Sequence, residues 1–324
     1  MSLLNISLRD LEYLLALHQH GHFGRAAEAC HVSQPTLSGQ LAKLEEQLGL
    51  LLVDRSRRQI RFTAAGEALI GRAQKIVRDV QELVDEARRW QDPLAGELRL
   101  GIIPTVAPYL LPLLLAGQER VLPQLTLILR EAQTDTLVAA LEAGELDALV
   151  VAELPRLAPY AKAVLYDEPM LLATAPNHPL AGQEALEQQA LEGRRLLMLE
   201  DGHCLRDQAL GYCADGGGGE DTSFRATSLE TLRQLVASGR GITLLPALAA
   251  KAEGGHAVCY RRFSLPQPAR RIVLLWRRGA GLDRTCRPLA AMISDVVKPQ
   301  LAGYSSTTVD SEPVVHGEQG YADN

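Results

Sequence analysis

The sequence has little that would place it in or across a membrane. No apolar run reaches the roughly 18 residues of a membrane-spanning helix, and the first residues lack the basic start, apolar stretch and cleavage site of a secretory leader. Cysteine is scarce, with five residues scattered at positions 30, 204, 213, 259 and 286. An odd, dispersed set excludes the disulfide framework of a small secreted protein. We therefore expect a cytoplasmic protein in which any disulfide is transient and regulatory.

An excess of positive charge is also missing. The net charge of -6 argues against a protein that simply coats nucleic acid, and 47% hydrophobic residues over 324 positions allow two or three globular domains. Residues 1–62 are nearly neutral, whereas residues 301–324 hold only acidic charges and read as a disordered acidic tail. We expect neither a metal nor a cofactor.

The first sixty residues predict a helix-turn-helix. Leucines recur with helical spacing after residue 8, and residues 23–30 form a second, alanine-rich helix. Ser33 is a good N-cap for a third helix with Pro35 in its first turn. The polar start of this helix suits base and phosphate contacts in the major groove. The candidate DNA-contacting residues are Ser33, Gln34, Pro35, Thr36, Ser38 and Gln40.

An arginine-rich segment follows this helix. Arg55, Arg57 and Arg58 alternate with residues that suit a β-hairpin, which predicts a wing contacting phosphate or the minor groove. Any small three-helix core can resemble a helix-turn-helix, but the adjacent arginines favour DNA binding. Residues 1–62 are thus predicted to be a mainly α-helical, winged helix-turn-helix DNA-binding domain.

Residues 63–91 predict a long linker helix. Its hydrophobic stripe has the alternating four and three spacing of a heptad seam, which favours pairing with a second copy over an intramolecular cover. A dimer would present two recognition helices to a two-fold-related DNA site. The residues of the stripe are Leu69, Ala73, Ile76, Val80, Leu83 and Ala87. Residues 92–96 break the helix as a hinge.

Residues 97–300 alternate strand and helix patterns. Strands are expected at 97–103, 125–129 and 146–151 with helices between them, and the pattern resumes after residue 165. This rhythm predicts parallel sheets covered by helices on both faces. Two α/β lobes, with the chain crossing between them twice, are the expected architecture.

Cys204 and Cys213 form the most informative pattern in this region. A thiolate is favoured beside cationic groups or a helix N-terminus, and His203 and Arg206 flank Cys204 where a helix is expected to begin. Nine residues of helix separate two Cα atoms by about 13 Å, whereas a disulfide needs about 7 Å or less. Bonding the two cysteines would therefore break local structure, as a switch does. The alternative is a pair of ordinary, half-buried cysteines.

A family resemblance joins these observations. The ungapped stretch from Phe23 to Ser38, with its Val-Ser-Gln-Pro turn, closely resembles the winged helix-turn-helix of LysR-type transcriptional regulators. The blocks at 103–112, 131–134, 196–208 and 224–232 resemble the peroxide-sensing members of that family. The resemblance implies a periplasmic-binding-protein-like effector domain at 97–300, with two lobes.

The resemblance also implies roles for individual residues. Cys204 would be the peroxidatic thiol and Cys213 the resolving thiol of a reversible disulfide. Five more residues match positions that line or support the peroxide pocket, although each threonine alone could simply cap a helix. They are Thr105, Thr134, His203, Asp207 and Arg271.

The implied function is a non-enzymatic, peroxide-responsive regulator of oxidative-stress genes, mainly an activator. Its partners would be double-stranded promoter DNA, RNA polymerase, hydrogen peroxide, a thiol reductant for reset and further copies of the chain, as a dimer of dimers. A LysR-type regulator of a small organic effector, or a thiol peroxidase, are the alternatives. Two features depart from the family: Ser223 replaces a histidine, and glycines at 216–219 predict unusual flexibility after Cys213.

Overall fold

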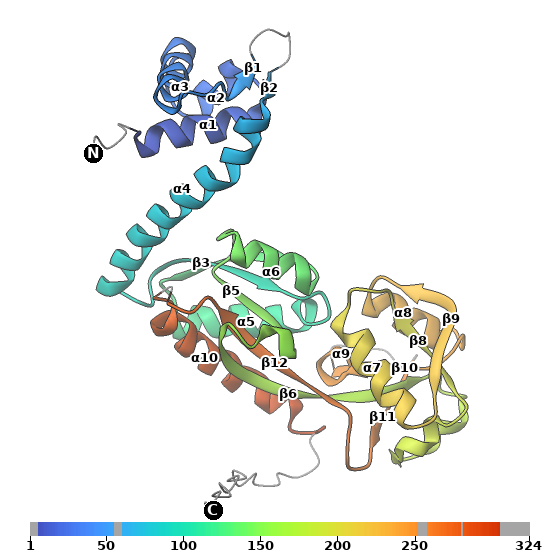
Figure 1. Cartoon of the computed structure of the whole chain (residues 1–324). Helices are drawn as coiled ribbons and strands as arrows, with labels where there is room; N and C mark the ends of the chain where they lie inside the picture. The colour runs from blue at the N-terminus through green and yellow to red at the C-terminus, as the bar shows by residue number, and fades with distance from the viewer. Residues whose placement is uncertain (1–5, 55–59, 252–257, 280, 305–324) are drawn as a thin grey trace, which may run out of the picture.

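The computed structural model describes residues 6–54, 60–251, 258–279 and 281–304 (Figure 1). Its N-terminal part holds three short helices and a two-stranded hairpin, in which β1 and β2 are antiparallel. A long helix leads from it to the rest of the chain. These elements are α1 (Leu8–His20), α2 (Phe23–Ala29), α3 (Gln34–Leu48), β1 (Val53–Asp54), β2 (Arg61–Phe62) and α4 (Ala64–Gln91).

The helix ends follow the predicted signals. Ser33 caps α3 by accepting a hydrogen bond from the Thr36 amide, and Gly21 and Gly49 end α1 and α3 in the left-handed region. His31, with φ of 55°, makes the turn between α2 and α3. The helix-turn-helix expected from the sequence is therefore present, with its turn at residues 30–33.

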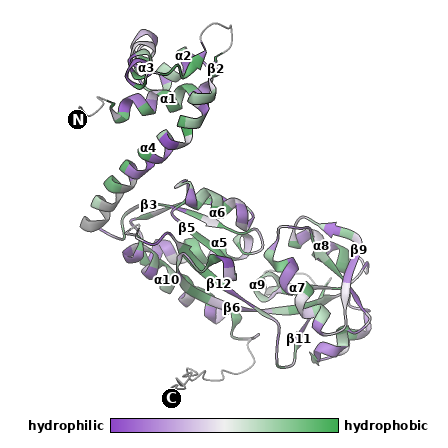
Figure 2. Cartoon of the chain, viewed as in Figure 1, coloured by the Kyte–Doolittle hydropathy of each residue, from purple (hydrophilic) through white to green (hydrophobic). Residues whose placement is uncertain are grey.

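Only the first part of the α4 stripe is covered within the chain. Ile70 and Ala73 are buried against the helix-turn-helix core. Farther along, Ile76, Leu83 and Val84 are exposed, and Figure 2 shows hydrophobic and hydrophilic residues side by side along this helix. A hydrophobic face that the described chain leaves in solvent is available for another molecule.

The remaining residues build a mixed sheet. β3 pairs in parallel with β4 and β5, as expected, but β12 is antiparallel to both β5 and β6. The prediction of purely parallel sheets is wrong, because the strand that leaves the first half and the strand that returns to it run side by side in opposite directions. The elements of this half are β3 (Gly96–Ile102), α5 (Ala107–Val121), β4 (Leu125–Glu131), α6 (Thr134–Glu142), β5 (Ala148–Ala152), β12 (Ala269–Trp276) and α10 (Asp283–Leu301).

The long strand β6 (Ala161–Thr174) links the two halves, each of which has its own hydrophobic core. Its first residues pair with β12 and its last residues pair with β10 and β11. Short 3-10 turns lie at Pro155–Leu157, Pro179–Gly182 and Gln188–Leu191. The second half contains β7 (Ala185–Leu186), β8 (Arg195–Leu199), α7 (Cys204–Asp215), β9 (Gly219–Ala226), α8 (Leu229–Ala237), β10 (Thr243–Pro246), α9 (Ala247–Lys251) and β11 (Cys259–Phe263).

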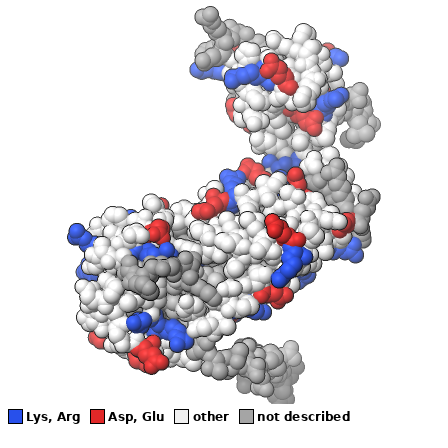
Figure 3. Space-filling model, turned by 180° about the vertical axis from the view of Figure 1, so that it is seen from behind, with Lys and Arg blue, Asp and Glu red and all other residues white. Residues whose placement is uncertain are grey.

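Within the described residues, no helix is long and apolar enough to span a bilayer. Charges on the face seen in Figure 3 are mixed, with basic and acidic side chains interspersed over the larger part of the molecule. This distribution agrees with the acidic net charge and gives the larger part no continuous basic field on that face.

Candidate functional site: the Cys204 pocket

Cys204 is the first residue of α7 and lies where the two halves of the larger part meet. Its Sγ is 3.0 Å from the Thr134 hydroxyl, which belongs to the first turn of α6 in the other half. Gly202, just before it, has φ of +93°, and a Cβ there would lie 2.6 Å from the Gln133 side-chain oxygen. Only glycine therefore allows the loop to bring Cys204 this close to α6.

Two hollows meet at Cys204. One is about 10 Å³, the space of roughly one water-sized molecule, and its wall contains Thr105, Thr134, His203 and Cys204. The other is open, about 360 Å³, and lined in part by Asp207 and Cys204. Four of the five expected pocket residues are thus gathered around the thiol. Neither threonine supplies a helix cap, because Val106 and Gln133 are the N-caps of α5 and α6 and neither helix has a side-chain cap bond.

Thr105 is held by a buried ion pair. Its hydroxyl accepts a hydrogen bond of 2.8 Å from the Arg270 guanidinium, and its carbonyl accepts another of 3.0 Å. Arg270 also pairs with Glu168, and both side chains are 1% exposed. The second oxygen of Glu168 accepts from the Leu248 amide at 3.0 Å. This chain of bonds connects the pocket wall to β6, β12 and α9.

The basic residue at the pocket is Arg270, not Arg271 as expected. Successive side chains on β12 point to opposite faces, so Arg270 faces inward opposite Glu168 and Arg271 faces outward opposite Asp167. The Arg271 side chain is 50% exposed and donates to Asp167 at 2.7 Å. The prediction for Arg271 is wrong by one residue, which on a strand reverses the face.

Neither of the two cationic neighbours expected beside Cys204 supplies a free positive charge, because His203 is neutral and Arg206 pairs with carboxylates. Burial lowers the pKa of His203, with Glu200 opposing the shift, so its imidazole is neutral near pH 7. Arg206 points instead toward Glu220, at 2.8 Å, and Asp201, at 3.4 Å. In the small hollow, the thiol therefore lies beside the N-terminal turn of α7, the Thr134 hydroxyl and a neutral histidine. Arg156 lines the open hollow.

Cys213 lies near the other end of the same helix, as the sequence predicts. Its side chain is fully buried, and burial raises the pKa of its thiol to about 12. Both thiols are free. Because α7 is continuous from residue 204 to 215, a bond between the two sulfurs requires that helix to unwind.

Two of the glycines after Cys213, Gly216 and Gly218, are closely packed. The Gly218 amide donates to the Cys213 carbonyl at 2.8 Å, and Gly216 donates to the carbonyls of Tyr212 and Cys213. A Cβ on Gly216 would lie 2.6 Å from the Gln188 carbonyl oxygen. The expected unusual flexibility does not match these contacts, because the run serves as the C-terminal cap of α7 and packs against the 3-10 turn at Gln188–Leu191.

The candidate DNA-contacting residues lie at the start of α3. Gln34, Pro35 and Thr36 are exposed, and Ser38 and Gln40 are partly exposed. Ser33 is exposed too, but its hydroxyl already bonds the Thr36 amide and lies 2.8 Å from the Thr36 hydroxyl. The wing arginines Arg55, Arg57 and Arg58 lie outside the described residues, between the paired strands β1 and β2.

The other cysteines lie away from this pocket. Cys286 is buried in the core of the first half, while Cys30 and Cys259 are partly exposed. Among the residues that the structure describes, no group of three or more His, Cys, Asp or Glu side chains could hold a metal ion.

Comparisons with known proteins give the family. Residues 8–67 match the bacterial regulatory helix-turn-helix protein, lysR family, and residues 91–298 match the LysR substrate binding domain. The chain belongs to the LysR family of bacterial regulators. It joins a helix-turn-helix to a LysR substrate binding domain.

Three LysR-family relatives are especially similar. The hydrogen peroxide-inducible genes activator of Pectobacterium carotovorum is 47% identical over 93% of this chain and 99% of its own length. A full-length OxyR variant from Pseudomonas aeruginosa is 37% identical, with a TM-score of 0.70 over 90% of this chain and 98% of its own. A hydrogen-peroxide-bound OxyR mutant from Corynebacterium glutamicum is 33% identical, with a TM-score of 0.64 over 93% and 97%.

Proposed function

We propose that this LysR-family chain is a hydrogen-peroxide-responsive transcriptional regulator, mainly an activator of oxidative-stress genes. The observation that carries the proposal is the very small hollow beside Cys204, walled by two threonines and a neutral histidine. The small hollow has room for one oxygen atom of a peroxide beside the sulfur, and the open hollow, which also reaches Cys204, has room for the other and provides a route from solvent. The similarity to named peroxide-responsive activators supports the same function.

The chemistry requires only peroxide and the two thiols. The Cys204 thiolate attacks one peroxide oxygen, the O–O bond breaks, and the departing hydroxide takes up a proton to become water. Thr105, Thr134 and His203 hold the peroxide in line with the sulfur and donate to the leaving oxygen. The Cys213 sulfur then attacks the sulfur of the Cys204 sulfenic acid and forms the disulfide. The hydroxyl of the sulfenic acid leaves with the Cys213 proton as a second water. Asp207, at the open hollow, borders the route of entry.

The disulfide is the switch because it is incompatible with α7. Closing it unwinds the helix, withdraws Cys213 from its core and frees the loop that leads into β9. The two halves of the regulatory domain, which we take to be of the periplasmic-binding-protein-like type, then shift in their packing. A thiol reductant resets the switch.

Assembly transmits this change to DNA. The exposed residues Ile76, Leu83 and Val84 on α4 support pairing of two copies through the linker helices, within a dimer of dimers. Paired helices hold two α3 recognition helices at a fixed spacing on promoter DNA. Ser33, Gln34, Pro35, Thr36, Ser38 and Gln40 would contact the major groove, and Arg55, Arg57 and Arg58 would contact the backbone or minor groove. A shift in spacing changes how the complex meets RNA polymerase.

The test combines thiol trapping with footprinting. Micromolar peroxide should convert Cys204 and Cys213 to a disulfide detected by mass spectrometry, and DNase footprints on candidate promoters should differ between reduced and oxidised protein. Cys204→Ser should keep the reduced footprint after peroxide. Thiols that stay reduced, or one identical footprint in all three samples, would exclude the proposal and favour a regulator of an organic effector. Rapid cycling with a thiol reductant, in which each chain consumes many equivalents of peroxide at one per reduction, would instead identify a peroxidase.

A further inference from the structure

Tyr212, next to Cys213 on α7, reaches out of its own helix to the end of β11 and the segment that follows it. Its ring meets the ring of Phe263 edge to face, with centroids 5.2 Å apart. Its hydroxyl lies 3.5 Å from the carbonyl of Pro266, to which it donates. Edge-to-face pairs of this kind are favourable beyond the area that they bury. The C-terminal half of α7 is therefore attached to the segment between β11 and β12.

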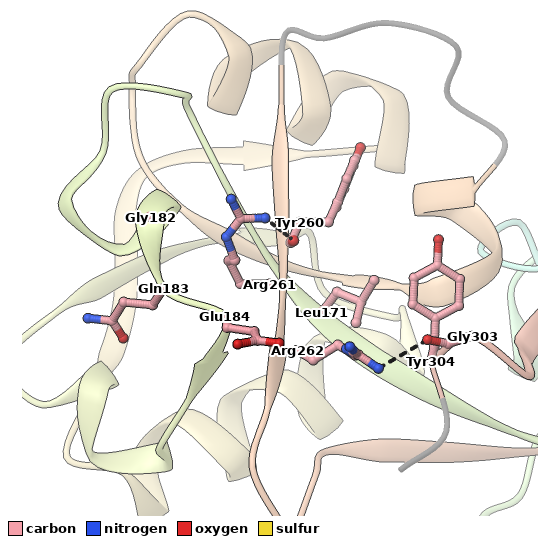
Figure 4. Close-up of a pocket in the computed structure, with 9 residues that line it drawn as sticks. All are labelled: Leu171, Gly182, Gln183, Glu184, Tyr260, Arg261, Arg262, Gly303 and Tyr304. Atoms are coloured by element: carbon pink, nitrogen blue, oxygen red, sulfur yellow. Dashed lines mark hydrogen bonds between the residues drawn. The ribbon is translucent and has the colours of Figure 1, made fainter.

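The partner of Tyr212 is firmly fixed. Phe263 is buried and pairs with Leu186 of β7, while β11 also pairs with β6 on its other side. The two arginines before Phe263 also donate hydrogen bonds to backbone carbonyls of other segments. Figure 4 shows the bond from Arg262 to the Gly303 carbonyl. Arg261 donates to the Ala181 carbonyl at 2.6 Å. These contacts hold β11 in place, so movement of α7 must separate the two rings.

The backbone around Tyr212 is held on the opposite side too. The Gln188 amide donates to the Tyr212 carbonyl at 2.9 Å. Tyr212 and Cys213 thus enter the core of the second half together, one as a partly buried ring and the other as a fully buried thiol. Withdrawing the Cys213 sulfur toward Cys204 carries Tyr212 with it, since the two residues are adjacent.

We propose that Tyr212 is a positioning residue that, through Phe263 and Pro266, holds Cys213 buried and so limits the rate at which the Cys204 sulfenic acid is converted to the disulfide. This inference rests on the proposed peroxide switch. The contacts of Tyr212 are made before oxidation and are lost when α7 unwinds, so they slow the second step alone. The first step occurs at the far end of the helix and is unaffected. Tyr212 thereby sets how long the sulfenic acid persists.

The experiment measures the two steps separately in the full-length protein. A dimedone-type probe and mass spectrometry follow Cys204 sulfenic acid, and quenched samples follow the disulfide. We expect Tyr212→Leu to leave the peroxide reaction of Cys204 unchanged and to speed disulfide formation about 5- to 10-fold, from the loss of one aromatic pair and a hydrogen bond. Tyr212→Phe, which keeps the ring, should give a rise of about 2-fold.

A double-mutant cycle tests whether the effect comes from this contact. Phe263→Leu keeps a buried apolar side chain but removes the ring partner, and it should speed the second step by less than Tyr212→Leu, which also removes the hydrogen bond to Pro266. The double variant should be no faster than Tyr212→Leu alone, because that variant already removes the ring contact that Phe263→Leu removes. Tyr160→Leu is the matched control, since the Tyr160 hydroxyl donates to Glu142 in the first half, away from α7.

The possible results are distinct. If Tyr212→Leu leaves the rate of disulfide formation unchanged and Cys204 is oxidised normally, the proposed role of Tyr212 is overturned. The proposed peroxide switch is unaffected by that result. Equal acceleration by Tyr160→Leu also overturns it, because general loosening would then be the cause. Absence of both the sulfenic acid and the disulfide after peroxide treatment of the unaltered protein would instead contradict the proposed function itself.

Discussion

The two ends of α7 differ in almost every physical property although they belong to one twelve-residue helix. At its start, Cys204 is partly exposed between two hollows and touches a hydroxyl from the other half of the domain. Near its end, Cys213 is fully buried with its pKa raised to about 12, behind a ring contact and a glycine cap. One thiol is placed to react with a small solute, and the other is kept from reacting until the helix opens.

The largest expected effect is the difference in reactivity between the two thiols. At pH 8, a thiol with a pKa of about 12 is thiolate in only about one molecule in 10,000, and Cys213 is also inaccessible. Iodoacetamide should therefore label Cys204 at least about 100-fold faster than Cys213 in the reduced, folded protein. Peptide mass spectrometry provides the rates, and unfolded protein should label at both positions. Equal labelling rates for Cys204 and Cys213 in the folded protein would show that the two ends of α7 do not differ in thiol reactivity.

The buried ion pair behind the reactive end predicts the largest loss of stability. Arg270→Met leaves the Glu168 carboxylate buried without its partner and should cost about 3–5 kcal/mol of unfolding free energy. Arg271→Met, one residue along on the exposed face, should cost less than about 1 kcal/mol. Urea unfolding measures both. Similar losses would mean that the inward and outward arginines are equivalent, and adding Glu168→Gln to Arg270→Met should recover part of the loss.

The glycine cap at the closed end predicts a smaller loss. Gly216→Ala places a Cβ against the Gln188 carbonyl and should destabilise the protein by about 1–3 kcal/mol. Gly219→Ala has nothing within 4 Å of its new methyl and should stay within about 0.5 kcal/mol. Denaturant unfolding of the two variants measures both losses. If the glycines formed a loosely packed segment instead of a helix cap, neither substitution would lower the free energy of unfolding.

The helix between the two ends offers a substitution in the opposite direction. Gly211 is exposed on α7, with nothing within 4 Å of an added Cβ. Gly211→Ala should stabilise the helix by about 0.5–1 kcal/mol and slow disulfide formation about 2- to 5-fold, since the helix must unwind. Gly71→Ala on α4 is the control, being equally open. A faster disulfide in Gly211→Ala would contradict unwinding as the slow step.

The smallest effect concerns pH. Burial lowers the pKa of His203 in the folded state, so the unfolded chain binds a proton that the folded chain does not as pH falls below about 6.5. Stability should therefore decline from pH 7.5 toward pH 5 and then level off below the folded pKa. His203→Gln should reduce that decline, measured as the difference between the two proteins in urea midpoint across the series. An identical pH profile would show that the histidine titrates freely.

Much of this architecture could be predicted from local sequence. The capped helices around His31, the linker helix and the strand and helix rhythm after residue 97 follow short-range rules of capping and periodicity. The positions of Thr105, Thr134 and His203 around Cys204 were inferred from resemblance, and the structure brings them together. Ile103, Pro104 and Gln133 also line the small hollow and were not singled out as pocket residues, although they lie in the blocks at 103–112 and 131–134 that carry the resemblance.

The choice between Arg270 and Arg271 shows where local reasoning stops. Two adjacent arginines on a strand carry no local mark of which one faces the core, because the answer depends on the register of β12 against β6. Glu168 could not be linked to either arginine for the same reason. The mixed direction of the sheet likewise depends on which strands become neighbours after the chain crosses between the halves.

The sequence by itself determined that two cysteines share one helix, that glycine precedes the first and follows the second, and that a helix-turn-helix precedes them all. These features depend on spacing within a few residues. Only the tertiary structure decided that Arg206 pairs with Glu220, that Arg270 supports Thr105 and that the Tyr212 ring packs against Phe263 of β11, about fifty residues later. Burial and long-range contacts determine those features, and no local pattern encodes them.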